Sequence, residues 1–303
     1  MKKQLLSLCL ALFTFTACSV DEPEQPSTEK EKATVTFNVS DLAVSVGDFK
    51  SGSNATTLAD SVKKFADYLS CKIYDNNGTP YTIINQTKST PNFGTFRVEL
   101  PVGSYKAAFA ASTGNFNWNV ANNYIGQDYV DPGNRTYDLF FKKIDQIKVS
   151  EDAVEEVILD RIVSGIDLVV EDSIPSEVSS ISIITKNEGS VHMVLDGISM
   201  GSVPTRTATF TIGSRDRRIL NKTFSTYALP NDGIPGTAVE IKAFDASAKE
   251  LVSKEVKVDY IRNKKITIKG KLFTCLSTGN SNPNFSIKVN ETWDKGGVEV
   301  KLP

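Results

Sequence analysis

Residues 95–112 read TFRVELPVGSYKAAFAAS, and this stretch decides the fold class. Apolar and polar residues alternate through 95–100, a proline and a glycine follow, and an apolar-rich run then resumes. A period of two places every second side chain on one face of a β-strand, and Pro101-Val102-Gly103 supplies a turn. The residues expected to face the core are Phe96, Val98, Leu100, Tyr105, Ala107 and Phe109. The stretch therefore predicts two strands joined by a turn.

The same pattern recurs along most of the chain. It appears in ATVTFNVS (33–40), KKITIKGKLF (264–273) and NFSIKVNETW (284–293). The segment FDASAKE (244–250) reads as a turn between strands and corresponds to YDNNGTP (74–80) in the first half. The pattern predicts an all-β protein of two tandem β-sandwich domains, which we place at residues 34–150 and 151–303.

Three segments receive separate predictions. Residues 157–175 (VILDRIVSGIDLVVEDSIP) predict one long strand that ends at Pro175. Residues 58–69 space their apolar side chains by four, three and four, which predicts a helix. Residues 111–137 are rich in Asn, Gly and aromatic residues and predict a long loop.

The N-terminus predicts export and a lipid anchor. Lys2 and Lys3 precede an apolar run that is too short to span a bilayer, and we therefore read residues 1–17 as a signal peptide. Cys18 follows directly and is the expected lipidation site, since a small residue, Ala17, precedes it. Residues 18–33 are acidic and rich in proline, which predicts a flexible tether. The expected location is the outer membrane, with the protein exposed on the cell surface.

Composition argues against several functional classes. The 303-residue chain carries a net charge of −2 without a basic patch, so nucleic acid is not an expected partner. His192 is the one histidine, which leaves no two-histidine metal site and no local support for a Ser-His-Asp triad. We expect no cofactor, no metal and no enzymatic activity.

Two further groups are candidate site residues. Cys71 and Cys275 could form a disulfide in an oxidising compartment, or could be two unrelated buried thiols. Trp118, Tyr124 and Tyr129 could form a ligand platform for a sugar or a protein, or could pin their loop onto its own domain.

The ordered set of motifs resembles the fimbrillin superfamily of the Bacteroidales, and within it the fimbrial anchor and assembly lipoproteins. The set consists of Phe15-Thr16-Ala17-Cys18, the run from KIYDNNGTPY (72–81) to residue 112, LDRIVSGIDLVVEDSIPSEVSSISI (159–183), and NKKITIKGKLF (263–273) with the later FSIKVNETW (285–293). The resemblance implies two transthyretin-like, Greek-key β-sandwich domains, no enzymatic activity, and other fimbrial subunits as partners.

The resemblance also bears on assembly. Shaft and tip precursors of the family are cut after an arginine near the N-terminus, which opens a groove for a neighbour's strand. The present chain has no arginine between Cys18 and Arg97, which favours an anchor that keeps its lipid. The candidate donor or acceptor strands are residues 33–40 and 297–302. The alternative function is a glycan-binding lipoprotein of the cell surface.

Overall fold

The structure, a computed structural model, describes residues 31–43, 58–119, 123–126, 137–234, 237–274 and 285–290. The predicted signal peptide, Cys18 and most of the predicted tether lie outside these residues. The strands described below all belong to one compact unit, Lys32–Pro303. The chain is nearly all β, as the alternating pattern predicts. Among the described residues, no helix is long and apolar enough to cross a bilayer.

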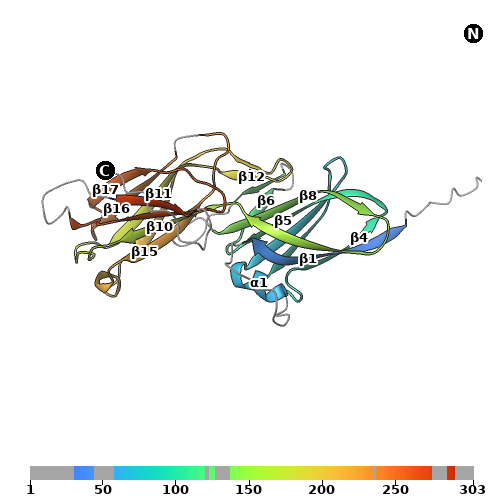
Figure 1. The fold of residues 1–303 in the computed structure, drawn as a ribbon, viewed down its shortest axis with the longest axis horizontal. Coiled ribbons are helices and arrows are strands. Elements are labelled where there is room, and N and C mark those ends of the chain that lie inside the picture. Colours follow the sequence, from blue (N-terminus) through green and yellow to red (C-terminus); the bar gives the residue numbers. More distant parts are fainter. Residues whose placement is uncertain are drawn as a thin grey trace, which may run out of the picture. The chain divides into compact units, whose positions relative to one another are not determined.

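The N-terminal half, by which we mean β1 to β9, is built on a seven-stranded sheet in the order β3-β2-β5-β8-β9-β1-β4 (Figure 1). Its sheet joins β8 to β9 through only two residue pairs, Phe140 with Arg161 and Phe141 with Asp160. The strands are β1 (Lys32–Ala43), β2 (Tyr68–Asp75), β3 (Pro80–Thr87), β4 (Thr95–Pro101), β5 (Gly103–Ser112), β8 (Leu139–Val149) and β9 (Ala153–Arg161).

The first core lies between the two ends of this sheet. The Phe37 ring on β1 contacts the Phe109 ring on β5, with centroids 5.2 Å apart, although these strands are not neighbours in the sheet. Val35, Phe37 and Val39 all point into this core, which confirms the alternation predicted for residues 33–40. The helix α1 (Leu58–Phe65) contributes Val62 to the same core.

The C-terminal half, β10 to β19 without the short strands β12 and β13, consists of two four-stranded sheets. Their orders are β15-β10-β18-β19 and β14-β11-β16-β17, and a second apolar core contains side chains of both. The strands are β10 (Ser164–Val170), β11 (Ser180–Glu188), β14 (Val203–Thr211), β15 (Lys222–Ala228), β16 (Ala238–Phe244), β17 (Glu250–Lys257), β18 (Lys265–Gly270) and β19 (Phe285–Asn290). A short 3-10 helix, Asp216–Arg218, precedes β15.

The two halves share one pattern of strand pairing. In the first, β1 pairs antiparallel with β4 and parallel with β9. In the second, β10 pairs antiparallel with β15 and parallel with β18. The remaining pairs also correspond, since β3-β2-β5-β8 in the first half matches β14-β11-β16-β17 in the second. The two halves thus repeat one arrangement of strands, while the count of two domains and the boundary near residue 150 stay predictions.

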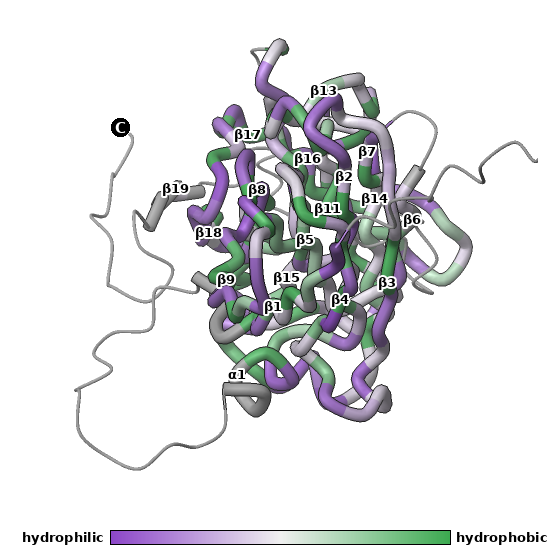
Figure 2. Tube along the Cα trace, turned by 90° about the vertical axis from the view of Figure 1, so that its right-hand side faces the viewer, coloured by the Kyte–Doolittle hydropathy of each residue, from purple (hydrophilic) through white to green (hydrophobic). Residues whose placement is uncertain are grey.

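A third sheet combines short strands from both halves. Its order is β13-β12-β7-β6, with β6 (Asn117–Asn119) and β7 (Tyr124–Gly126) inserted between β5 and β8, and β12 (Val191–Met193) and β13 (Ile198–Met200) inserted between β11 and β14. Strand β7 pairs antiparallel with β12. Beneath the sheet lies a third apolar core, which includes Trp118, Ile125, Phe141 and Val194. In Figure 2, hydrophobic residues, shown in green, surround the labels β5 and β11 near the centre of the view.

The long strand predicted for residues 157–175 is in fact two strands. Strand β9 ends at Arg161 and β10 begins at Ser164. Arg161 is buried, and its guanidinium donates two hydrogen bonds to the Asp138 carboxylate at 2.8 and 2.9 Å. Ile162 and Val163 enter the third core. The prediction failed because the alternation of apolar residues continues through the break. The Arg161–Asp138 hydrogen bonds and the burial of Ile162 and Val163 mark the point where the chain passes from one half to the next.

Two other predictions need correction. The helix stops at Phe65, and Leu69 belongs to β2, because its side chain enters the first core from that strand. The predicted loop 111–137 contains the two short strands β6 and β7. Strand β7 has a second partner, β12, which lies far away in the sequence, and no local pattern could reveal that pairing.

Candidate functional site

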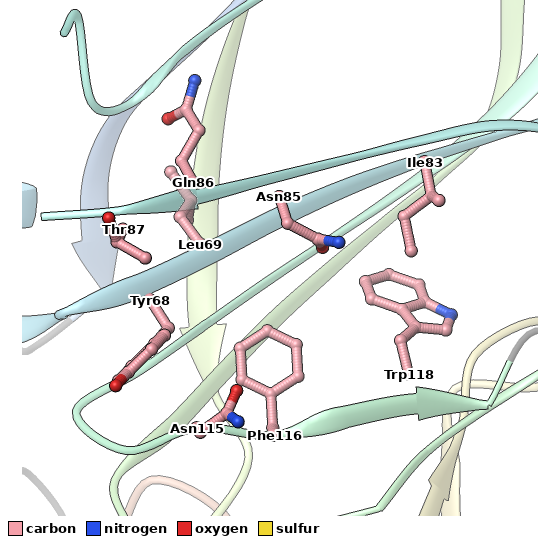
Figure 3. Close-up of a pocket in the computed structure, with 9 residues that line it drawn as sticks. All are labelled: Tyr68, Leu69, Ile83, Asn85, Gln86, Thr87, Asn115, Phe116 and Trp118. Atoms are coloured by element: carbon pink, nitrogen blue, oxygen red, sulfur yellow. The ribbon is translucent and has the colours of Figure 1, made fainter. Parts of the chain in front are cut away.

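A pocket of about 410 Å³ opens beside β2, β3 and the chain that enters β6 (Figure 3). Strands β2 and β3 are antiparallel neighbours, in register so that Tyr68 lies opposite Thr87 and Ser70 opposite Asn85. The full set of lining residues is Tyr68, Leu69, Ile83, Asn85, Gln86, Thr87, Asn115, Phe116 and Trp118.

The alternation of β3 decides which of its side chains reach the pocket. Successive side chains of a strand point to opposite faces. Gln86 points away from the other pocket side chains in Figure 3, and its amide bonds the backbone of Gly94 and Thr95 at 2.9 and 2.8 Å. Ile83 and Asn85 lie on the side of Trp118 and Phe116. The side chains of Asn115, Phe116 and Trp118 form the opposite wall.

The polar groups of the pocket are amides and hydroxyls. The Asn85 side-chain oxygen accepts a hydrogen bond from the Ser70 hydroxyl at 2.6 Å. Within the part of the chain that the structure describes, the Asn85 amide nitrogen, the Asn115 amide and the Tyr68 hydroxyl form no hydrogen bond. None of the nine lining side chains is charged.

A buried cation, the Lys72 ammonium, lies against the Trp118 ring. The side chain of Lys72, on β2, is fully buried, and its ammonium lies 4.9 Å from the centre of the Tyr74 ring and 5.9 Å from that of Trp118. The same ammonium donates a hydrogen bond to the Asn123 side chain at 3.2 Å. Burial lowers the pKa of Lys72. These contacts fix the indole ring against the sheet.

His192, the one histidine, occupies the third core. Its Nδ1 lies 3.1 Å from the Ser199 hydroxyl, and its ring meets the edge of Phe141 at 4.6 Å between centroids. Arg262 bonds the same Ser199 hydroxyl at 3.3 Å and also pairs with Asp232. Burial, with the positive charge of Arg262, lowers the pKa of His192 to about 3. The residue is therefore a neutral, buried member of the core.

The edges of the sheets form a second candidate site, for protein partners. In the C-terminal half, β19 runs antiparallel along the whole of β18, from Lys265 with Asn290 to Gly270 with Phe285. In the N-terminal half, β9 is the counterpart of β18. Beyond its pairing with β1, β9 has only the two residue pairs with β8, at its C-terminal end, among the described residues. Among the segments that the structure describes, no strand lies beside β9 from Ala153 to Leu159 as β19 lies beside β18.

The first strand, a predicted donor or acceptor element, is an inner strand. It lies between β9 and β4, and its side chains fill the first core. Residues 297–302, the other predicted element, lie outside the described residues.

The predicted site residues fall in different places. Trp118 is 7% exposed and lines the pocket, while Tyr124 is half-buried on β7, opposite Met193 of β12. Tyr129 lies outside the described residues, and so do Cys18 and Cys275. Cys71 is a free, buried thiol in the first core. Lipidation at Cys18 and pairing of Cys71 with Cys275 stay predictions.

Sequence reasoning missed most of the pocket. Tyr68 and Asn85 come from two strands and meet Phe116 only through the fold. The one available signal was the break in apolar alternation at Asn85 on β3. No group of three or more His, Cys, Asp or Glu residues in the described segments could hold a metal ion.

Comparison with known proteins identifies solved structures of similar fold. No protein-family model matches the sequence, and no curated protein matches it. Among solved structures, a candidate polysaccharide-binding protein of Bacteroides thetaiotaomicron superimposes with a TM-score of 0.54 at 11% identity, over 89% of this chain and 98% of that one. At this identity the likeness concerns the fold alone.

Fimbrial proteins are also among the structural neighbours. The tip fimbrial protein of Porphyromonas gingivalis, with a C-terminal truncation, has a TM-score of 0.46 at 10% identity, over 86% of this chain and 99% of that one. The fimbrial anchor protein of the same organism has a TM-score of 0.44 at 9% identity, over 86% and 98%. The solved structures that superimpose on this chain thus include fimbrial and adhesin proteins as well as a candidate polysaccharide-binding protein, and the likeness concerns the fold alone.

Proposed function

We propose that this protein is a surface-exposed lipoprotein of the outer membrane that serves as a fimbrial anchor or assembly component through addition of a partner's β-strand. The observation that carries the proposal is a difference in pairing between two equivalent strands, β18 and β9. Strand β18 receives β19 along its edge, whereas within the described part of the chain β9 has no such strand over most of its length. An open edge presents unpaired N–H and C=O groups that an extended segment can satisfy.

The outer face of β9 suits a partner strand. Val154 and Ile158 lie on that face and are 67% and 50% exposed. A strand added beside β9 would place its own side chains about 5 Å from these two residues, as cross-strand neighbours. Burial of the two apolar side chains would then add to the free energy of the backbone hydrogen bonds.

The position of β1 supports an anchor rather than a shaft subunit. Its removal would open the groove between β9 and β4 and uncover Val35 and Phe37. The sequence offers no arginine before this strand at which a trypsin-like protease could release it. In this proposal the chain keeps β1 and stays attached to the membrane through Cys18, since two or more acyl chains give stable anchoring.

The test is an immunoblot of gently solubilised native envelopes, unboiled beside boiled. Wild-type protein is expected to give a high-mass ladder that collapses on boiling. The double variant Val154→Lys/Ile158→Lys should lose the ladder, because two charges on β9 oppose strand addition. The matched control is Ile219→Lys/Leu220→Lys, which adds the same charges at two exposed apolar residues near β15 and should keep the ladder.

The outcomes separate the parts of the proposal. A single monomeric band in wild type would overturn stable strand exchange. A ladder that survives in the β9 variant would show that another edge receives the partner. Cys18→Ala protein that stays on the membrane would overturn the lipid anchor.

A further inference from the structure

We infer that the pocket beside β2 and β3 binds an uncharged sugar of one or two rings. The inference is independent of strand addition, because no residue that lines the pocket belongs to β9. It concerns a small-molecule ligand rather than a subunit.

The size of the pocket limits the ligand. Its volume is about 410 Å³. Small-molecule sites in proteins range from about 300 to 1,000 Å³, so this pocket lies near the lower end. A ligand with one or two rings fits such a volume, and a longer chain would have to extend into solvent.

The charge of the lining determines the ligand's charge. The polar side chains of the pocket are Tyr68, Asn85, Gln86, Thr87 and Asn115, and all are neutral. A charged ligand would lose hydration and gain no counter-charge from the nine lining side chains, which costs free energy. The pocket therefore favours a neutral molecule over a phosphate, a carboxylate or an amine.

The free polar groups select hydroxyls. An asparagine amide carries both a donor and an acceptor, as does the tyrosine hydroxyl. Asn85 has its oxygen satisfied by Ser70 and offers its amide nitrogen, while Asn115 offers both ends. A ring that carries several hydroxyls can donate to some of these groups and accept from others. Few other neutral ligands present such a set on one small ring.

The aromatic rings supply an apolar surface. Figure 3 shows the Phe116 and Trp118 rings beside Asn85, with Tyr68 at the far end of the pocket. Sugars have apolar C–H faces as well as hydroxyls, and an aromatic ring offers such a face a large, rigid contact. Lys72 and the pairing of β6 with β7 hold Trp118 in place, which reduces the entropy lost on binding.

The experiment uses the full-length protein and saturation-transfer NMR with glucose, galactose, mannose and N-acetylglucosamine, and with glucuronic acid as the charged comparison. At least one neutral sugar should bind, with a dissociation constant on the order of 1 mM, as expected for a small open site. Glucuronic acid should bind more weakly than glucose. Asn85→Leu should weaken binding by roughly three- to tenfold, through the loss of a hydrogen bond. Asn76→Leu is the matched control, since Asn76 is exposed at the β2–β3 turn outside the pocket lining, and should leave binding unchanged.

Two results would overturn the inference. One is no binding of any of the four neutral sugars, and the other is equal binding by the Asn85 variant and wild type. Tyr68→Leu provides a second test if Asn85→Leu does not fold, as judged by circular dichroism. Since neither substitution touches β9, the unboiled ladder should persist in both, so failure of one proposal does not affect the other.

Discussion

At the scale of single residues, the third core places an ionisable group where a charge is costly. His192 is fully enclosed, with Phe141 on one side and the Arg262 guanidinium near Ser199. A second positive charge there would lose hydration and oppose Arg262. The protein therefore keeps this ring neutral in the folded state.

This arrangement predicts acid sensitivity. The pKa of His192 is about 3 when folded and near 6.5 when unfolded. The unfolded chain therefore binds a proton that the folded chain does not, and stability should be full above pH 6.5 and fall as pH drops toward 3. The expected loss is about 1.4 kcal/mol for each pH unit below roughly 6.

Urea unfolding at pH 7.5 and pH 5 measures the effect. His192→Gln keeps a polar partner for Ser199 and removes the titration, so its stability should change less between these pH values than that of wild type. Equal losses in the two proteins would show that other groups carry the acid sensitivity.

At the scale of elements, two hairpins contain turns of the same kind. The Asp75 carboxylate accepts hydrogen bonds from the N–H groups of Asn77 and Thr79, and the Asp245 carboxylate accepts them from Ser247 and Lys249. The strand register shifts next to each aspartate. Sequence reasoning identified both turns as a pair. It could not show that they join non-equivalent strands, since β2–β3 corresponds to β11–β14 and not to β16–β17.

The two turns differ at their left-handed position. Gly78 has φ of 87°, and the corresponding residue in the second turn, Ala248, has φ of 64°. The left-handed conformation costs a residue with a Cβ roughly 1–2 kcal/mol, whereas glycine adopts it freely.

Ala248→Gly should therefore be neutral or stabilising, although glycine makes the unfolded chain more flexible. Ala246→Gly in the same turn is the matched control, because Ala246 has no positive φ and should lose about 0.5–1 kcal/mol. Denaturant unfolding should place the two variants about 1–2 kcal/mol apart. Equal destabilisation by both would mean that Ala248 carries no strain.

At the scale of the whole molecule, the sequence predicted the all-β fold better than it predicted the contacts that join the two halves. Alternation of Val35, Phe37 and Val39 depends on local burial and can be read directly. The third sheet pairs residue Ile125 with His192, across a long sequence separation. The pocket depends on the same insertion, because Phe116 and Trp118 reach Asn85 only when β6 is in place. Periodicity does not encode such contacts.

The third core should make the two halves unfold together. Ile125 is fully buried there, and truncation to alanine typically costs 2–5 kcal/mol at such a site. Calorimetry of wild type should show one transition, whereas Ile125→Ala should show two, because the halves keep separate cores. Ile261→Ala, at an exposed isoleucine, is the control and should keep a single transition. Two transitions in wild type would contradict the coupling.

The inner position of β1 has a mechanical consequence. If the chain is anchored through Cys18 as proposed, flow across the cell surface pulls on it at Lys32, where this strand begins. Hydrogen bonds in a sheet run across the strands, so tension along β1 loads its bonds to β4 and β9 in shear, all at once rather than one after another. A strand held on both sides in this way resists force far better than one that can peel from an edge. The same placement that completes the first core would thus also make the first strand a point of attachment that resists tension.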